Sequence, residues 1–239
     1  MGMDEDKTDN PPTCKMLVVD KLLDRLTNSK ENKVQERSAH ALGYLLVGEP
    51  KFAHRQKLID GLCEAAKIRQ VELQFTIGES LSCAGAGYRS QAARDPWTAQ
   101  AMEARADEPD TDVMKDLIEM IVTKHSKNPV PHARQASCVW LLALVKYSGN
   151  HSAIQNDLRR IQMTFMSFLA ESDELTQEVA SKGLGLVYEL GGEERREELV
   201  SLLVDTLTSG GRRNMQVTEE TKVFGEGELG KAPEGYGTV

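Results

Sequence analysis

The chain has 239 residues, of which 40% are hydrophobic and only 5% aromatic, and a formal net charge of −8. The hydrophobic share is enough for a core, and few aromatics are typical of layers filled by Leu, Ala and Val. The negative charge argues against general binding to nucleic acid or anionic membranes, because phosphates need a basic face. No apolar run approaches the length of a membrane span, so we expect no direct membrane insertion.

The start of the chain, MGMDEDKTDNPP, is acidic and polar, whereas a secretory signal needs a basic start and an apolar run. We therefore expect residues 1–13 to be a disordered acidic tail. The four cysteines lie far apart without any C-x-x-C pair, which predicts reduced thiols in a cytoplasmic or nuclear protein.

Helical periodicity begins directly after this tail. Helices are expected over 15–27 and 34–47, then over 52–68 and 71–84, so that 14–84 consists of helical repeats. A break between the two pairs is predicted at GEP, because glycine and proline interrupt helices.

The helical signal weakens over 85–112, where the turn-rich groups GAGYRS, DPW and DEPDTD occur. We predict an irregular insert between repeats, in which 90–94 and 99–106 could each form a local helix. Trp97 is the one large apolar residue of this insert. It either packs the insert onto the repeats or anchors a partner.

Helical repeats are expected to resume over 113–209. The helices predicted there cover 113–124, 132–147, 158–169 and 194–207, and another lies within the stretch 171–192. From residue 210 the chain turns to Gly, Lys, Glu and Thr, so 210–239 is predicted to be a Gly-rich connector or tail.

The clearest helix signal is the stretch ESDELTQEVASKGLGLVYELGG, residues 171–192. Ser172 or Asp173 can cap the helix start, and its apolar residues follow a helical face and do not alternate. Gly183 and Gly185 are unusual, because each costs about 1 kcal/mol against alanine inside a helix. We expect the close approach of a neighbouring helix to offset that cost.

The same pattern recurs in three earlier stretches, 34–48, 71–83 and 132–149. Aligning the copies places one apolar column at Leu42, Leu81, Val139 and Leu184, with spacings of 39, 58 and 45 residues. Helix pairs of about 40–47 residues are the repeat unit of HEAT and armadillo arrays, and the insert explains the long spacing. The sequence therefore predicts an all-α, HEAT/armadillo-like α-solenoid of about four to five helix pairs with one irregular insert.

Candidate chemical motifs are weak. GEGELGK, residues 225–231, has the spacing of a phosphate-binding loop, but Ala232 stands where Ser or Thr should bind the metal, and Pro233 follows. The five histidines have no metal-ligand spacing, and His125 and His132 flank a proline turn, which predicts surface positions. Cys138 next to Trp140 is expected to be a small buried hydrophobe and not a nucleophile. We expect no catalytic residue, metal or cofactor.

The sequence also resembles a known family. The matching runs are ERSAHALGYLLVGEPKFAHR, QVELQFTIGESLSCA, GELGKAPEGYG and above all the stretch from HARQASCVWLLALVKYSG through DELTQEVASKGLGLVYELG. These runs are similar to the extracellular-mutant family of large HEAT-repeat proteasome adaptors and scaffolds, over about residues 20 to 237. Members of that family are far longer, so the resemblance implies an internal or partial segment of a long solenoid.

The resemblance implies a non-catalytic scaffold that binds the proteasome and links its core particle to its regulatory particle. It also implies that proteasomes are coupled to endoplasmic reticulum, endosomes and motors through partners, in the cytoplasm and nucleus, as part of ubiquitin-dependent protein catabolism. The alternative is a generic helical-repeat adaptor for transport or phosphatase assemblies, and an enzyme is a distant third.

The resemblance supplies no binding residues, but the usual geometry of a solenoid suggests some. Second helices of such pairs usually line the concave face of a solenoid, and their polar sides are the candidate partner-binding surface. These candidates are Arg37, His40, Gln135, Glu178, Ser181 and Lys182.

Overall fold

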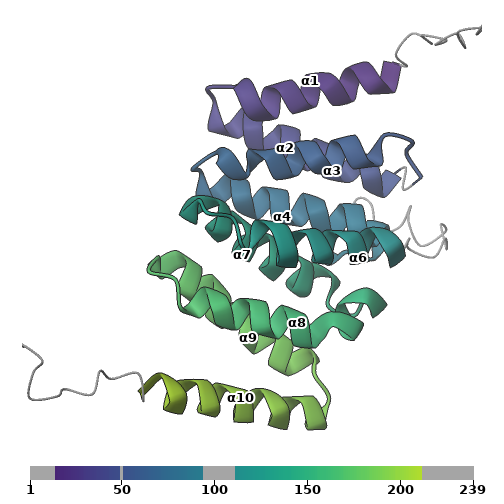
Figure 1. Cartoon of the computed structure of the whole chain (residues 1–239). Coiled ribbons are helices and arrows are strands. Elements are labelled where there is room, and N and C mark those ends of the chain that lie inside the picture. Colours follow the sequence, from purple (N-terminus) through teal and green to yellow (C-terminus); the bar gives the residue numbers. More distant parts are fainter. Residues whose placement is uncertain (1–13, 49–50, 94–110, 212–239) are drawn as a thin grey trace, which may run out of the picture. The chain divides into compact units, whose positions relative to one another are not determined.

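The computed structural model describes residues 14–48, 51–93 and 111–211, and every regular element within these ranges is helical (Figure 1). The predicted tail at 1–13, Trp97, residues 99–106 and the end of the chain from 212 lie outside the described residues. By contacts the chain divides into two compact units, Met1–Arg196 and Glu197–Val239. The first unit carries the repeats.

Two helix pairs form the start of the first unit. Helix α1 (Cys14–Asn28) pairs with α2 (Asn32–Gly48). Helix α3 (Arg55–Glu64), extended by the 3-10 turn η1 (Ala65–Lys67), precedes α4 (Val71–Ala86). The predicted helix over 52–68 is therefore shorter than expected and tightens into a 3-10 turn at its end.

Two more pairs follow. Helix α6 (Thr111–Glu119) continues as a π-helical turn, η4 (Met120–His125), and precedes α7 (Pro131–Ser148). Helix α8 (Ser152–Leu169) pairs with α9 (Glu174–Leu190). Most of α10 (Glu193–Gly211) belongs to the second unit.

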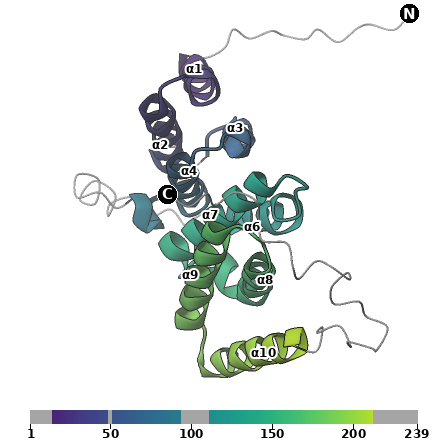
Figure 2. The same ribbon diagram turned by 90° about the vertical axis from the view of Figure 1, so that its left-hand side faces the viewer.

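The helix pairs of the first unit stack in two layers (Figure 2). Helix α2 packs on α4, α4 on α7 and α7 on α9, so the second helices form one layer. In the other layer α1 contacts α3, and α6 contacts α8. This arrangement confirms the predicted all-α solenoid.

The core of this stack contains the apolar column found by aligning the repeats. Leu42 and Leu81 are 0% exposed, Val139 is 1% and Leu184 is 7% exposed. The column positions are equivalent in space as well as in sequence, because each lies on the inward side of a second helix. The repeat alignment is therefore confirmed at these four residues.

The first residues of the predicted insert pack against the repeats. Two 3-10 turns, η2 (Gly87–Arg89) and η3 (Gln91–Ala93), follow α4. Ala93 is fully buried in a cluster with Val47 of α2 and Cys83 of α4. The chain after α4 is thus held on the solenoid as far as residue 93.

Candidate protein-binding surface

The predicted binding surface begins on α2, where Arg37 and His40 are both exposed. The His40 ring lies against Tyr44 one turn later, with 4.5 Å between ring centroids. Both predicted residues therefore have solvent-exposed side chains on α2.

On α9 the three predicted residues Glu178, Ser181 and Lys182 are also exposed. Lys182 Nζ donates to Glu178 Oε1 at 2.6 Å, one helical turn away. Exposed pairs of this kind contribute only about 0.3–0.5 kcal/mol. A partner could therefore rearrange these charges at little cost.

Gln135 of α7 is half-buried and engaged within the chain. Its Nε2 donates to Asp173 Oδ2 at 2.7 Å. The same carboxylate caps α9 by accepting from the backbone N–H of Thr176 at 2.8 Å, as the sequence predicted for Ser172 or Asp173. The hydroxyl of Thr176 also donates to this carboxylate, at 2.6 Å, and is the main cause of the lowered pKa of Asp173. Burial opposes the shift, and the bonds from Gln135 and from the backbone of Thr176 add to it.

The six candidates fall into separate groups. In the layer, α4 and α7 lie between α2 and α9, because α2 packs on α4, α4 on α7 and α7 on α9. Residues 136–145 of α7, which lies between these groups, are all buried. The reason is that α7 is covered on several sides, by α4, α9, η4 and the turns η1 and η3. The structure therefore groups the α2 candidates with one another and the α9 candidates with one another. It does not join the two groups in one patch.

A second clamp beside Gln135 holds the α8–α9 turn to α7. Arg134 binds Glu171 in a bidentate manner, with Nε to Oε1 at 2.6 Å and Nη2 to Oε2 at 2.7 Å. Its Nη1 also donates to the carbonyls of Asn128 and Pro129, at 2.8 and 3.1 Å. The hydrogen bonds from Arg134 lower the pKa of Glu171. A bidentate arginine–carboxylate pair fixes the relative orientation of its two side chains and also adds stability, so it holds the α8–α9 turn in a defined position on α7.

Sequence reasoning missed a repeated glutamine. Gln35, Gln74 and Gln177 each stand seven residues before the buried column. Their Nε2 atoms donate to carbonyls near the end of the preceding helix: Gln35 to Leu26 at 3.0 Å, Gln74 to Ala65 at 3.0 Å, and Gln177 to Glu171 at 2.6 Å. Each glutamine is the fourth residue of its helix, so these bonds tie the start of a second helix to the end of the helix before it or to the turn that follows. The recurring spacing was visible in the sequence and could have identified this function.

His125 corrects another expectation. It was predicted to lie on the surface but is only 9% exposed, with its ring edge-on to Trp140 at 5.4 Å between centroids. Neither ring nitrogen has a hydrogen-bond partner among the described residues. The reason is the π-helical turn η4, which carries His125 inward toward α7 before the proline turn begins.

Acidification is expected to destabilise the protein through His125. Burial, followed by the charge of Lys124, lowers its pKa in the folded state below 6.5, while nearby Glu64 opposes this shift. The unfolded chain therefore binds more protons, so the free energy of unfolding should fall as the pH drops below about 6.5. Urea denaturation at pH 7.5 and 5.5 measures this loss.

His125→Phe should reduce the loss, while His54→Asn at an exposed site should not. Some loss remains in either variant, because burial also lowers the pKa of His151. An identical pH dependence in His125→Phe and the unmodified chain would contradict this assignment.

The three buried cysteines, Cys63, Cys83 and Cys138, are poorly suited to nucleophilic chemistry, whereas Cys14 is exposed. Cys138 is fully buried, as predicted, and its thiol lies 3.7 Å from the carbonyl of Thr176. Burial raises the pKa of Cys138 and raises those of Cys63 and Cys83 to about 12. At neutral pH these groups are thiols, and the thiolate is the reactive form.

Two further properties concern only the part of the chain that the structure describes. Within it, no group of three or more His, Cys, Asp or Glu side chains could hold a metal ion. None of its helices has both the length and the apolar character needed to cross a membrane.

Comparison with known proteins gives clear relatives. No protein-family model matches the chain. It is 47% identical over 226 residues to the human "Proteasome adapter and scaffold protein ECM29", a match that covers 93% of this chain and 12% of the relative. The Drosophila melanogaster "Proteasome-associated protein ECM29 homolog" is 33% identical, with 87% of this chain and 11% of the relative covered.

A more distant relative is the Saccharomyces cerevisiae "Proteasome component ECM29", which is 28% identical over 89% of this chain and 12% of its own length. A solved structure of an engineered protein aligns over 72% of this chain and 97% of its own, with 15% identity and a TM-score of 0.25, too low to establish a common fold. The chain thus spans about 12% of the human relative's length. In sequence, the chain is therefore similar over nearly its whole length to one segment of the ECM29 proteins.

Proposed function

We propose that this chain is a non-catalytic scaffold segment that binds the proteasome. The observation that carries the proposal is the 47% identity to a proteasome adapter and scaffold protein over 93% of the chain. The fold is compatible with this role, because a stack of helix pairs presents an extended surface for protein partners.

The finer features of the proposal concern the whole assembly. In it, the scaffold links the core particle to the regulatory particle and couples proteasomes to other cellular components in the cytoplasm and nucleus. The contact surface is the outer side of the second-helix layer, formed by the exposed residues of α2 and α9. Gln135 contributes indirectly by holding the α8–α9 turn in place through Asp173.

The test is capture of proteasomes from cell lysate by the tagged chain, with quantitative mass spectrometry and a matched helical-repeat protein as background. Arg37→Glu combined with Lys182→Glu should reduce capture by about tenfold, because like charges placed across an interface cost several kcal/mol. Both side chains are exposed, so the melting temperature should change little.

The matched control is Lys21→Glu combined with Lys127→Glu, two exposed lysines on the first-helix side of the stack. It changes the net charge equally but should leave capture intact. Equal capture by all three proteins would contradict the proposed surface. Enrichment of transport or phosphatase assemblies in place of proteasome subunits would favour a generic adaptor.

A further inference from the structure

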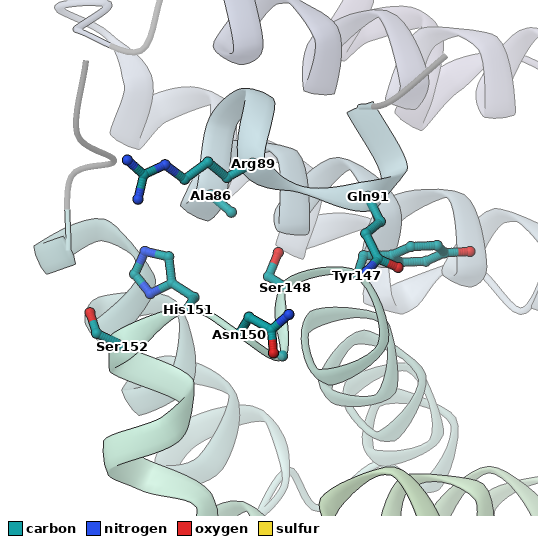
Figure 3. A pocket seen from close by; sticks show the side chains of 9 residues that line it. Ala86, Arg89, Gln91, Tyr147, Ser148, Asn150, His151 and Ser152 are labelled. Carbon is teal, nitrogen blue, oxygen red and sulfur yellow. The ribbon is translucent and has the colours of Figure 1, made fainter. Parts of the chain in front are cut away.

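A cavity of about 390 Å³ lies where the end of α4 and the turns η2 and η3 meet the α7–α8 turn (Figure 3). Its size falls in the range of ligand sites, about 300–1,000 Å³. Most of its lining is polar. The side chains that give it this character are Arg89, Gln91, Tyr147, Asn150, His151 and Ser152.

The charge of this cavity is opposite to that of the chain. Among the residues that the structure describes, no carboxylate lines it, although the chain carries a net charge of −8. Arg89 is exposed and forms no ion pair or hydrogen bond with any residue that the structure describes. Glu79 lies outside the lining, and its Oε1 accepts from the hydroxyl of Tyr147 at 2.8 Å. Within the described part of the chain, the guanidinium of Arg89 is therefore a cation at the cavity without a compensating carboxylate.

His151, beside Arg89, has a ring nitrogen without a hydrogen-bond partner among the described residues. Its Nδ1 accepts from the backbone N–H of Ala153 at 3.2 Å and so caps α8. The proton of the neutral ring must then be on Nε2. That nitrogen is shielded from bulk water and has no hydrogen-bond partner among the described residues. His151 lies beside Arg89 (Figure 3), so this part of the cavity holds both an N–H donor and a cation that lack an acceptor or an anion among the described residues.

The charge of the lining also distinguishes between kinds of anion. Burial, followed by the charge of Arg89, lowers the pKa of His151 and keeps its ring neutral at pH 7. The lining then carries one formal positive charge, that of Arg89. A carboxylate has one negative charge and fits the planar guanidinium through two parallel hydrogen bonds. A phosphate group carries nearly two charges and is usually held by a cluster of arginines.

We propose that this cavity binds a side-chain carboxylate from an acidic peptide segment of a protein partner. The inference rests on the proposed scaffold function for the nature of the partner. Arg89 pairs with the carboxylate, while Asn150 and Ser152 at the α7–α8 turn offer further donors. The positive end of the α8 dipole favours a negative charge at the same place.

The test is a titration of the full chain followed by backbone amide NMR. The probe is an acetylated and amidated Gly-Glu-Gly tripeptide, and Gly-Gln-Gly is its uncharged counterpart. The glutamate peptide should shift the amides of Gly149, Asn150 and Ser152. Arg89→Gln should weaken its binding by at least about tenfold, because hydrogen bonds to charged groups contribute roughly 1.5–3 kcal/mol. Arg69→Gln, at another exposed arginine, should not.

Three results would overturn the inference. They are equal shifts with both peptides, binding of the glutamate peptide that Arg89→Gln leaves unchanged, and saturation by inorganic phosphate at far lower concentration than by the peptide. The last result would make this a phosphate site. Because the titration contains no proteasome, its failure would leave the proposed function untouched, and failed proteasome capture would leave the cavity's ligand untouched.

Discussion

Replacing Trp140 by alanine is expected to lower the free energy of unfolding by about 3–5 kcal/mol, the usual cost of deleting a large buried aromatic side chain. Trp140 is 0% exposed and belongs to α7, which contacts both layers of the stack. Its Nε1 donates to Gln74 Oε1 at 3.1 Å, and its ring packs against His125. One side chain therefore joins α7 to α4 and to η4.

Urea denaturation followed by far-UV circular dichroism measures this loss. Trp140→Phe separates packing from hydrogen bonding, because it keeps a large ring but leaves Gln74 Oε1 without its donor. Its cost should be smaller, about 1–3 kcal/mol. Phe75→Ala is the control, since Phe75 is an aromatic residue of α4 that is 39% exposed. A loss in Trp140→Ala no larger than that in Phe75→Ala would show that Trp140 does not join the layers.

The second large effect is expected at Gly183, where alanine should destabilise the protein by about 1–2 kcal/mol. A Cβ at this position would lie 2.4 Å from the ring of Phe165 in α8. Phe165 is itself 0% exposed, so its ring could give way only by displacing other core side chains. Overpacking costs about 1–3 kcal/mol, and so close a contact should place the cost in the upper part of that range. After the gain of about 1 kcal/mol in helix propensity, a net loss of about 1–2 kcal/mol remains.

Gly185, two residues later in the same helix, is the matched control. It is exposed, and no neighbouring heavy atom lies within 4 Å of where its Cβ would be. Gly185→Ala should therefore stabilise the protein by up to about 1 kcal/mol through helix propensity alone. Thermal and urea denaturation of both variants test the pair. If the two alanines shift stability in the same direction, the close approach at Gly183 is not what decides its identity.

These two sites show how the binding surface depends on the core. Trp140 and Gly183 hold α7 against α4 and α9 against α8, and α2 and α9 carry the exposed candidates for partner contact. Core variants should thus lower stability and binding together. Charge reversal at Arg37 and Lys182 should affect binding alone. Measuring both stability and binding therefore distinguishes residues that contact the partner from residues that hold the helices in place.

Local sequence determined most helices of this protein. The 3.6-residue periodicity located them and aligned the column at Leu42, Leu81, Val139 and Leu184, because both depend on neighbours within a few turns. The cap at Asp173 was predictable for the same reason. Helix α8 begins at Ser152, before the predicted residue 158, because His151 caps it. Histidine is not among the usual capping residues, so that start was missed.

Tertiary structure decided which side chains are exposed for partner contact and which are engaged or buried within the chain. Gln135 is engaged by Asp173, 38 residues away, and Trp140 meets Gln74, 66 residues away. The sequence predicted neither contact, since helical periodicity gives the inward side of a helix but not its neighbour. His125 became buried because a π-turn redirected it. Of the two unusual glycines, only Gly183 meets another helix. Side-chain periodicity is a property of one helix, whereas engagement and burial depend on how the helices pack.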